Sequence, residues 1–188
     1  MNMVADKSKG FISKLNKTSV ALPNALINEA HSILASLELP TTRNEAWKYT
    51  RVAKLGKIDF SNYKGNVSSV DAYAIDTQAP TLVFVNGYYS ESLSYGNFPD
   101  GVSFTLLSES DEVPSSIPLD GEIFNALNTA HLIDGVSLKI AKNTTVEQPI
   151  QIIHILDGQS VMSNFKTMVD AGAFAKAGII QGYFATEA

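Results

Sequence analysis

Residues 134–155, DGVSLKIAKNTTVEQPIQIIHI, carry the clearest β-structure signal in the chain. Two apolar runs, VSLKIA and PIQIIHIL, flank a turn tripeptide at residues 143–145. The second run is almost continuously apolar from Gln148 to Leu156, which is typical of a strand buried on both faces or stacked in a solenoid. Two more β-prone runs follow, FKTMVDA and AFAKAGIIQGYFA. The last third of the chain is therefore predicted to be strand after strand.

A short internal match suggests that these strands form regular coils. Residues 131–138 align with residues 154–161 as H-[LI]-[IL]-D-G-x-S-[LV], 23 residues apart. A β-helix winds one coil per roughly 20–25 residues, and each coil stacks on the next. Asp-Gly is also a common turn pair, and two copies are fewer than the roughly three that a solenoid needs. Coincidence therefore stays an open alternative, and the β-rich prediction does not depend on the match.

Helices are expected toward the N-terminus. Apolar residues at spacings of three and four predict a helix over Asn24–Leu39, with Asn24 as N-cap and Pro40 as the stop. Its apolar face consists of Leu26, Ala30, Ile33, Leu34 and Leu37. A weaker amphipathic helix is expected within residues 4–17, and a short one over Glu122–His131.

Between the helices, the sequence predicts a hairpin. The runs TLVFV and YYSESLS flank Asn86-Gly87, the residue pair that a type I′ turn favours because both central positions need positive φ. Val102–Leu107 is expected to be another strand. Residues 61–80 and 114–118 are expected to be a link and a loop, because they are rich in Ser, Asn, Gly, Asp or Pro.

Composition narrows the possible functions. The 188 residues carry a net charge of −5, which disfavours nucleic-acid binding. No apolar run approaches the roughly 18 residues of a membrane span, and the N-terminus lacks the apolar core of a signal peptide, so a cytoplasmic protein is expected. The absence of cysteine excludes disulfides, a nucleophilic thiol and thiolate-held metal or iron–sulfur sites within these residues.

No candidate site carries a reaction assignment. Motifs for nucleotide binding, serine hydrolysis and zinc proteolysis are absent. An acidic run at Glu109, Asp111 and Glu112 suggests Ca²⁺ ligands, but a solvated loop is the simpler explanation. Two His-Asp pairs, His131 with Asp134 and His154 with Asp157, suit acid–base or metal chemistry, and a strand residue followed by its turn is the simpler explanation. A packed helix-edge residue is the expectation for His31. We assign no catalytic, cofactor-binding or metal residue.

The only tryptophan lies in Pro40–Thr50, PTTRNEAWKYT. Trp47 and Tyr49 stand among mixed charges directly after the expected helix stop. Such a stretch is most often a joint, in which the rings pack between structural units and the charges stay in water. A binding surface is the alternative, because contact surfaces favour aromatic residues and arginine.

The string E-x-W-K-Y-T, here Glu45–Thr50, resembles the N-terminal signature of the SufD family of the SufB–SufC–SufD iron–sulfur cluster assembly system. The hairpin LVFVNGYYSESLS and residues 134–155 are similar to that family in the same order. The resemblance covers residues 22–183. It implies an N-terminal helical domain, a β-helix and a C-terminal helical domain, and this chain looks like the N-terminal portion.

The resemblance thus implies an α+β chain, mainly β with N-terminal helices. We expect a helical domain over 1–60, a linker with mixed hairpin and short helix over 61–130, and the first coils of a β-helix over 131–188. The expected function is a non-enzymatic scaffold that acts with SufB and SufC. Family complexes handle iron–sulfur clusters, but the regions implied for SufC contact and for holding clusters lie outside these residues. No cofactor is therefore expected in this segment. Exposed strand edges would favour self-association.

Two alternatives stay open. One is a carbohydrate-active enzyme on a parallel β-helix, such as a polysaccharide lyase or esterase, which needs carboxylates and Lys or Arg on one β-face. The candidates scatter along the sequence with no evident shared register: Lys139, Lys142, Lys166, Lys176, Asp157 and Asp170. The other is a free-standing interaction module with no connection to iron–sulfur clusters.

Overall fold

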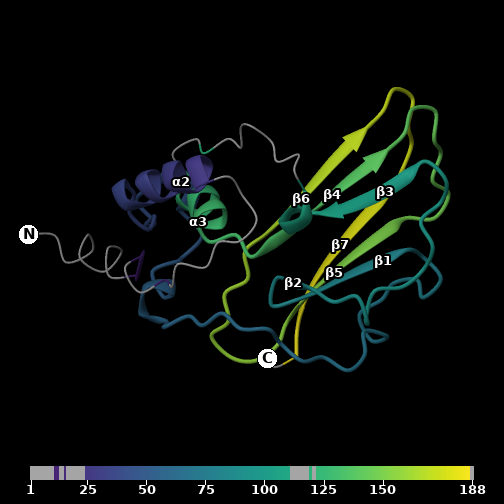
Figure 1. The fold of residues 1–188 in the computed structure, drawn as a ribbon. Helices are drawn as coiled ribbons and strands as arrows, with labels where there is room; N and C mark the ends of the chain where they lie inside the picture. Colours follow the sequence, from purple (N-terminus) through teal and green to yellow (C-terminus); the bar gives the residue numbers. More distant parts are fainter. Residues whose placement is uncertain (1–10, 13–14, 16–23, 111–118, 120–121, 187–188) are drawn as a thin grey trace, which may run out of the picture.

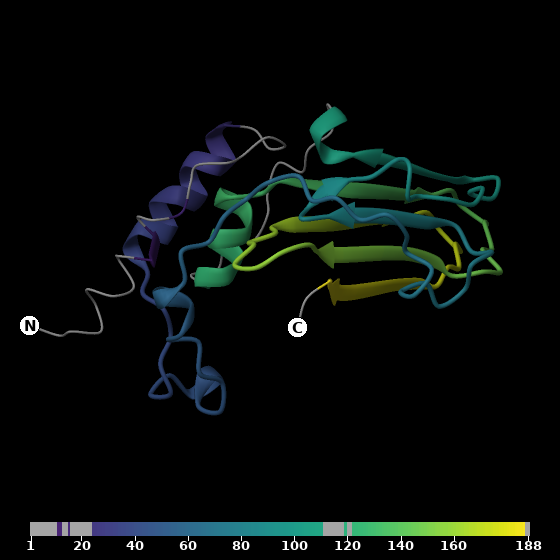
Figure 2. The same cartoon turned by 90° about the horizontal axis from the view of Figure 1, so that it is seen from below.

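The computed structural model describes residues 11–12, 15, 24–110, 119 and 122–186. Two β-sheets pack face to face, and two helices lie together at one end of the strands (Figure 1, Figure 2). The chain is therefore a mixed α/β protein built mostly of β-sheet. This agrees with the prediction of a mainly β chain with helices toward the N-terminus. The helix expected over residues 4–17 falls largely outside the described residues, and the loop expected at 114–118 falls outside them entirely.

The helical end is built from α2 (Asn24–Ser36) and α3 (Ile123–Ala130). The apolar face predicted for the first helix is confirmed, because Leu26, Ala30 and Leu34 are buried in the cluster that also holds the inner face of α3. The helix ends three residues before the predicted Leu39. Three short 3₁₀ helices lie elsewhere: η1 (Glu45–Trp47), η2 (Leu55–Lys57) and η3 (Leu107–Glu109).

One sheet has the strand order β2-β1-β5-β7 and the other has the order β3-β4-β6. The bounds are β1 (Thr81–Val85), β2 (Tyr88–Tyr89), β3 (Val102–Leu106), β4 (Asp134–Ile140), β5 (Ile150–Leu156), β6 (Phe165–Ala171) and β7 (Ile179–Ala185). The pairs β1–β5, β5–β7 and β4–β6 are parallel, whereas β1–β2 and β3–β4 are antiparallel. Strands from residues 81–106 and from residues 134–185 thus share both sheets.

From β4 onward, successive strands alternate between the two sheets. β4 therefore pairs with β6, and β5 pairs with β7. Asp134 on β4 lies opposite Phe165 on β6, 31 positions later. Ile150 on β5 lies opposite Ile179 on β7, 29 positions later. The 23-residue match is coincidental, because its two Asp-Gly pairs occupy different places: one opens β4, and the other turns the chain after β5, where Gly158 has φ +96°.

Both faces of β5 are covered, as its continuous apolar sequence predicted. Ile150 and Ile152 point into the core between the sheets. Ile153 and Ile155 point to the other side, where a second cluster includes Val70 and other residues of the 61–80 link. That link has little regular structure, as expected, but it is a packed cover for the outer face of the sheet.

Gln151 fixes this cover to the strand. Its Nε2 donates to the carbonyl oxygen of Asp76 (2.6 Å) and to Oγ1 of Thr81 (2.9 Å). Its Oε1 accepts from the backbone N–H groups of Ile75 (2.9 Å) and Asp76 (3.1 Å). A buried amide is costly unless its donors and acceptors are matched, so these four bonds explain how a polar residue stands in an apolar strand.

The predicted Asn-Gly hairpin is confirmed. Asn86 and Gly87 have φ values of +52° and +86°, as a type I′ turn requires. The Asn86 side chain also bonds across the fold: Nδ2 donates to the carbonyl oxygens of Tyr63 (3.2 Å) and Asp157 (3.1 Å), and Oδ1 accepts from the backbone N–H of Asp157 (2.8 Å). The turn thus joins the link, the hairpin and the end of β5.

Gly87→Ala should destabilise the protein by about 2–3 kcal/mol, because a side chain at positive φ is strained and overpacks the site. The added Cβ would lie 2.8 Å from Cδ1 of Ile133 and 2.9 Å from Oγ of Ser163. Urea unfolding measures the effect. Gly178→Ala is the matched control: its Cβ would meet Pro149 at an ordinary 3.5 Å, so stability should stay within about 1 kcal/mol of the parent. Equal losses would contradict this account of the turn.

Candidate functional site

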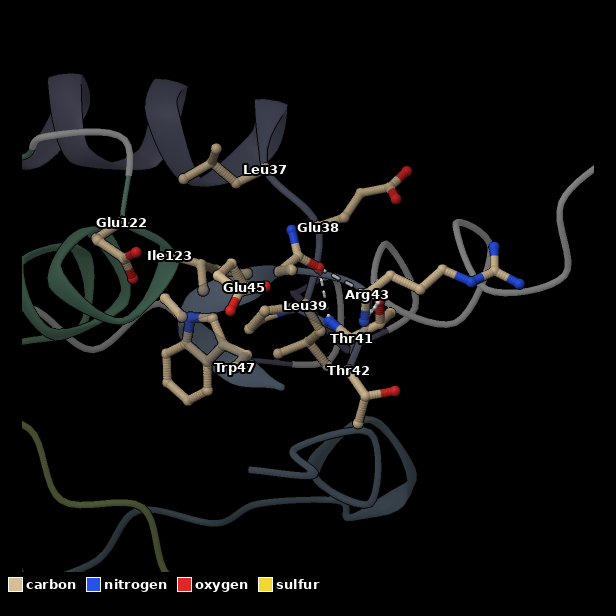
Figure 3. A pocket seen from close by; sticks show the side chains of 13 residues that line it. Leu37, Glu38, Leu39, Thr41, Thr42, Arg43, Glu45, Trp47, Glu122 and Ile123 are labelled. Atoms are coloured by element: carbon tan, nitrogen blue, oxygen red, sulfur yellow. Dashed lines mark hydrogen bonds between the residues drawn. The ribbon is translucent and has the colours of Figure 1, made fainter. Parts of the chain in front are cut away.

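A groove of about 750 Å³ lies beside the only tryptophan (Figure 3). Residues 37–47 line it together with Glu122 and Ile123 at the start of α3. Most of the PTTRNEAWKYT segment lines this groove. Its geometry therefore bears on whether the segment is a joint between structural units or a binding surface.

A tight turn sets the shape of this segment. Oδ1 of Asn44 accepts from the backbone N–H of Thr41 (2.9 Å) and from its Oγ1 (3.2 Å). The Asn44 backbone N–H donates to the Thr41 carbonyl (2.9 Å), and the Trp47 N–H donates to the Asn44 carbonyl (2.9 Å). The chain therefore turns directly after α2 and enters η1, which carries Trp47 back toward α3.

The packing of Trp47 agrees with the joint interpretation, and the packing of Tyr49 does not. The Trp47 ring lies 5.1 Å from the Phe124 ring of α3 and is half-buried. Tyr49 is 90% exposed, and the Lys48 ammonium lies 5.5 Å from the centre of its ring. Arg43 extends away from Trp47 in Figure 3, and the charged residues of the segment are exposed. The groove follows the seam between Trp47 and the helices.

Two histidines that are far apart in sequence meet at the helical end. The rings of His31 on α2 and His131, directly after α3, lie 5.2 Å apart at 85°. His131 is buried. The expectation of a packed helix-edge residue thus fits His31. Its partner lies 100 positions away, and no local pattern in the sequence could have identified it.

His154 belongs to an aromatic stack along the inner face of the first sheet. Its ring lies 5.6 Å from Phe84 on β1 and 4.7 Å from Tyr183 on β7, at interplanar angles of 23° and 10°. Phe165 on β6 meets its edge at 4.3 Å. The stack follows from the strand register, because Phe84, His154 and Tyr183 are direct neighbours across the parallel strands.

The His154 side chain is held neutral by its surroundings. It is 7% exposed and borders a cavity of about 480 Å³ that Asn128, Ser163 and Tyr183 also line. Its Nε2 has no hydrogen-bond partner in the described part of the chain. Burial lowers the pKa of His154 from 6.5 to about 4, because the charged imidazolium cannot be solvated there.

The two aspartates that were candidates for pairing with histidines bond to loop residues and strand ends, which agrees with the simpler explanation given for them. Asp134 accepts from Ser108 through its N–H (3.1 Å) and Oγ (2.9 Å), and from the N–H of Gly135 (2.7 Å). Asp157 accepts from the N–H of Asn66 (2.8 Å) and from Oγ1 of Thr186 (3.1 Å). Both carboxylates therefore tie loops to strand ends.

The remaining charged candidates form no assembled site. Of the acidic run only Glu109 is described, and no group of three potential metal ligands occurs among the described residues. The lysines and aspartates do not all scatter, however. Lys139 and Asp170 lie directly opposite each other on β4 and β6, which corrects the expectation that no register relates them.

Two edge strands, β6 and β7, expose apolar side chains. β6 and β7 each stand at the end of their sheet's strand order. Val169 on β6 is 47% exposed and Tyr183 on β7 is 72% exposed, although both point toward the space between the sheets.

Comparison with known proteins identifies relatives over most of the chain. The family described as the SufBD protein N-terminal region matches residues 8–152. An iron–sulfur cluster assembly SufBD family protein of Synechocystis sp. is 30% identical over 170 residues, which cover 82% of this chain and 37% of the relative. The iron–sulfur cluster assembly protein SufD of Escherichia coli is 24% identical over 151 residues, covering 77% and 35%. No helix in the described residues is long and apolar enough to cross a bilayer.

Trp47→Ala should destabilise the protein by about 1–3 kcal/mol, since it removes a half-buried ring from Phe124. Tyr49→Ala is the matched control and should change stability by less than about 0.5 kcal/mol, because that ring is exposed. Chemical unfolding of both variants gives the comparison. If Trp47→Ala kept full stability but abolished a partner contact, the groove would be a binding surface and not a joint.

His154 should make stability depend on pH. Its pKa is about 4 in the folded state and near 6.5 when unfolded, so the stability present above pH 6.5 falls as the pH drops toward 4. The full loss is about 3 kcal/mol. His154→Phe keeps an aromatic ring in the stack and cannot titrate. Its unfolding free energy should therefore fall less steeply than that of the parent between pH 6.5 and 4, and identical slopes would contradict the assignment.

Proposed function

The chain belongs to the SufBD family, and from that premise we propose that it is a non-catalytic scaffold component of iron–sulfur cluster assembly. Its 188 residues span little more than a third of the length of the curated relatives that it matches. The proposal therefore concerns the part of the scaffold that these residues build.

The observation that carries the proposal is the regular stacking of strands. β4 and β5 form one pass through the two sheets, and β6 and β7 repeat that pass in parallel register. In our proposal these are the first two coils of a β-helix, and the hairpin strand β1 and strand β3 seal its starting end. The two helices and Trp47 pack beside these first coils, at one end of their strands.

The polar groups of the described residues support a structural role. Most hydrogen bonds of four polar side chains join backbone groups of loops and turns, and the rest join hydroxyls there: Gln151, Asn86, Asp134 and Asp157. Such bonds hold a surface in a fixed shape, which is what an assembly scaffold requires. We propose that this segment needs no cofactor of its own, that it works in the cytoplasm, and that its partners are SufB and SufC.

The alternative of a carbohydrate-active enzyme keeps one supporting observation. Lys139 and Asp170 border a shallow groove with Gly101, Ser103 and Gly172 on the second sheet. A basic and an acidic group side by side on a β-face suit proton transfer from a sugar acid. Turnover of a polyuronide by the purified chain would favour this alternative over the scaffold.

Immobilised chain should retain purified SufB, because the family resemblance implies that contact with SufB runs through the β-helix, of which we propose these strands to be the first coils. SufC should be retained much less, since the helical domain expected to contact it lies outside these residues. Immobilised chain that carries Gly87→Ala should retain less SufB, in proportion to the fraction of the variant that is unfolded. Failure to retain SufB, or equal retention of SufC, would count against the proposed partners.

A further inference from the structure

We propose that the segment after α2 binds a second copy of this chain, with Tyr49 of each copy bound in the groove beside Trp47 of the other. The contact is reciprocal, so two identical sites close a symmetric dimer. The inference goes beyond the scaffold function and does not depend on it. It rests on an exposed aromatic ring, an open groove, and opposite charges around the two.

The segment that carries Tyr49 projects from the helical end of the molecule, away from both sheets (Figure 2). None of residues 41–60 is buried. Short turns shape its backbone, such as the one in which the Thr50 N–H donates to the Trp47 carbonyl (3.0 Å). At 90%, Tyr49 has the highest exposure of any large apolar side chain in the described residues. The segment therefore presents an aromatic ring to the outside of the molecule.

The groove beside Trp47 combines apolar surface with negative charge. Leu37, Leu39 and Ile123 line it together with the half-buried Trp47 ring. Three exposed carboxylates also line it: Glu38, Glu45 and Glu122. The basic lining residue, Arg43, extends away from Trp47 (Figure 3). A volume of about 750 Å³ leaves room for a tyrosine ring, so the groove suits an aromatic side chain that is flanked by positive charge.

Tyr49 is flanked by such charge. Residues 46–58 contain no acidic side chain and four basic ones, all exposed: Lys48, Arg51, Lys54 and Lys57. The Lys48 ammonium lies 5.5 Å from the centre of the Tyr49 ring, so charge and ring are presented together. Tyrosine and arginine are the residue types that most often anchor protein contacts, and opposite charges orient the two surfaces. The segment is therefore complementary to the groove in shape and in charge.

A second copy is the occupant because this chain carries both halves of the contact. Within one chain the two halves stay apart, since Tyr49 is 90% exposed and does not fill the groove that Trp47 lines. Two copies related by a twofold axis bring each Tyr49 to the other's groove. The same arrangement sets the basic residues of each segment against the carboxylates of the other copy, so the contact should weaken as salt screens these charges.

Fluorescence tests the contact directly, because the groove contains the only tryptophan of the chain. As the chain concentration rises through the micromolar range, Trp47 emission should shift to shorter wavelength, since the other copy's ring excludes water from the indole. Tyr49→Ala should abolish this shift and weaken association at least about tenfold in sedimentation equilibrium. Ile75→Ala is the matched control: it removes another exposed apolar side chain (72%) from the 61–80 link and should leave both readouts unchanged.

Charge reversal identifies the two surfaces. One variant carries Lys48→Glu and Arg51→Glu, and the other carries Glu38→Lys and Glu122→Lys. Each alone sets like charges against each other and should associate at least about tenfold more weakly than the parent, with circular dichroism confirming that it is folded. An equimolar mixture restores opposite charges at both sites and should form a heterodimer.

Three results would overturn the proposal: Trp47 emission of the parent that does not change with concentration, association that survives Tyr49→Ala, or no heterodimer on mixing the charge variants. A single-stranded oligonucleotide provides a further check on the basic segment. If it shifts the Trp47 emission of the dilute chain while raising the chain concentration does not, the segment binds nucleic acid and the proposal is wrong.

Discussion

The arrangement of the molecule depends on the burial of β5 on both faces. This strand needs a partner strand at each edge and a cover on each side, because its backbone and its isoleucines are all removed from water. β1 and β7 supply the edges, the sheet that contains β4 covers one side, and the irregular link over residues 61–80 covers the other. Two strands, the second sheet and the 61–80 link are therefore placed around the requirements of seven residues.

Buried polar side chains decide which of many apolar arrangements is adopted. Hydrophobic burial is not directional, so it cannot by itself fix where a loop lies on a sheet. Gln151 and Asn86 supply direction, since each leaves an unsatisfied amide if its loop shifts by one residue. The same logic explains why Asp134 and Asp157, which have the residue types of catalytic groups, are engaged in architecture.

The sequence predicted local elements well and their partners poorly. The Asn86-Gly87 hairpin, the apolar face of α2 and the continuous burial of β5 follow from patterns within a few residues. The pairing of β1 with β5, the parallel pairing of strands 29 to 31 positions apart and the contact of His31 with His131 join distant segments, and no local periodicity encodes them. Tyr49 shows the same limit on a smaller scale: it lies two residues from Trp47, yet the 3₁₀ turn points only one of the two rings at α3.

The pairing of β1 with β5 also has a consequence during synthesis. Thr81 lies opposite Gln151, 70 positions later, so the apolar strand TLVFV leaves the ribosome well before its parallel partner exists. At roughly 5–20 residues per second, that delay is about 4–14 seconds. Through this interval the hairpin has β2 on one edge and no strand on the other. During this interval the free edge of β1 must not pair with another chain. Either the nascent hairpin avoids such pairing by itself, or a chaperone covers the edge until β5 has been synthesised.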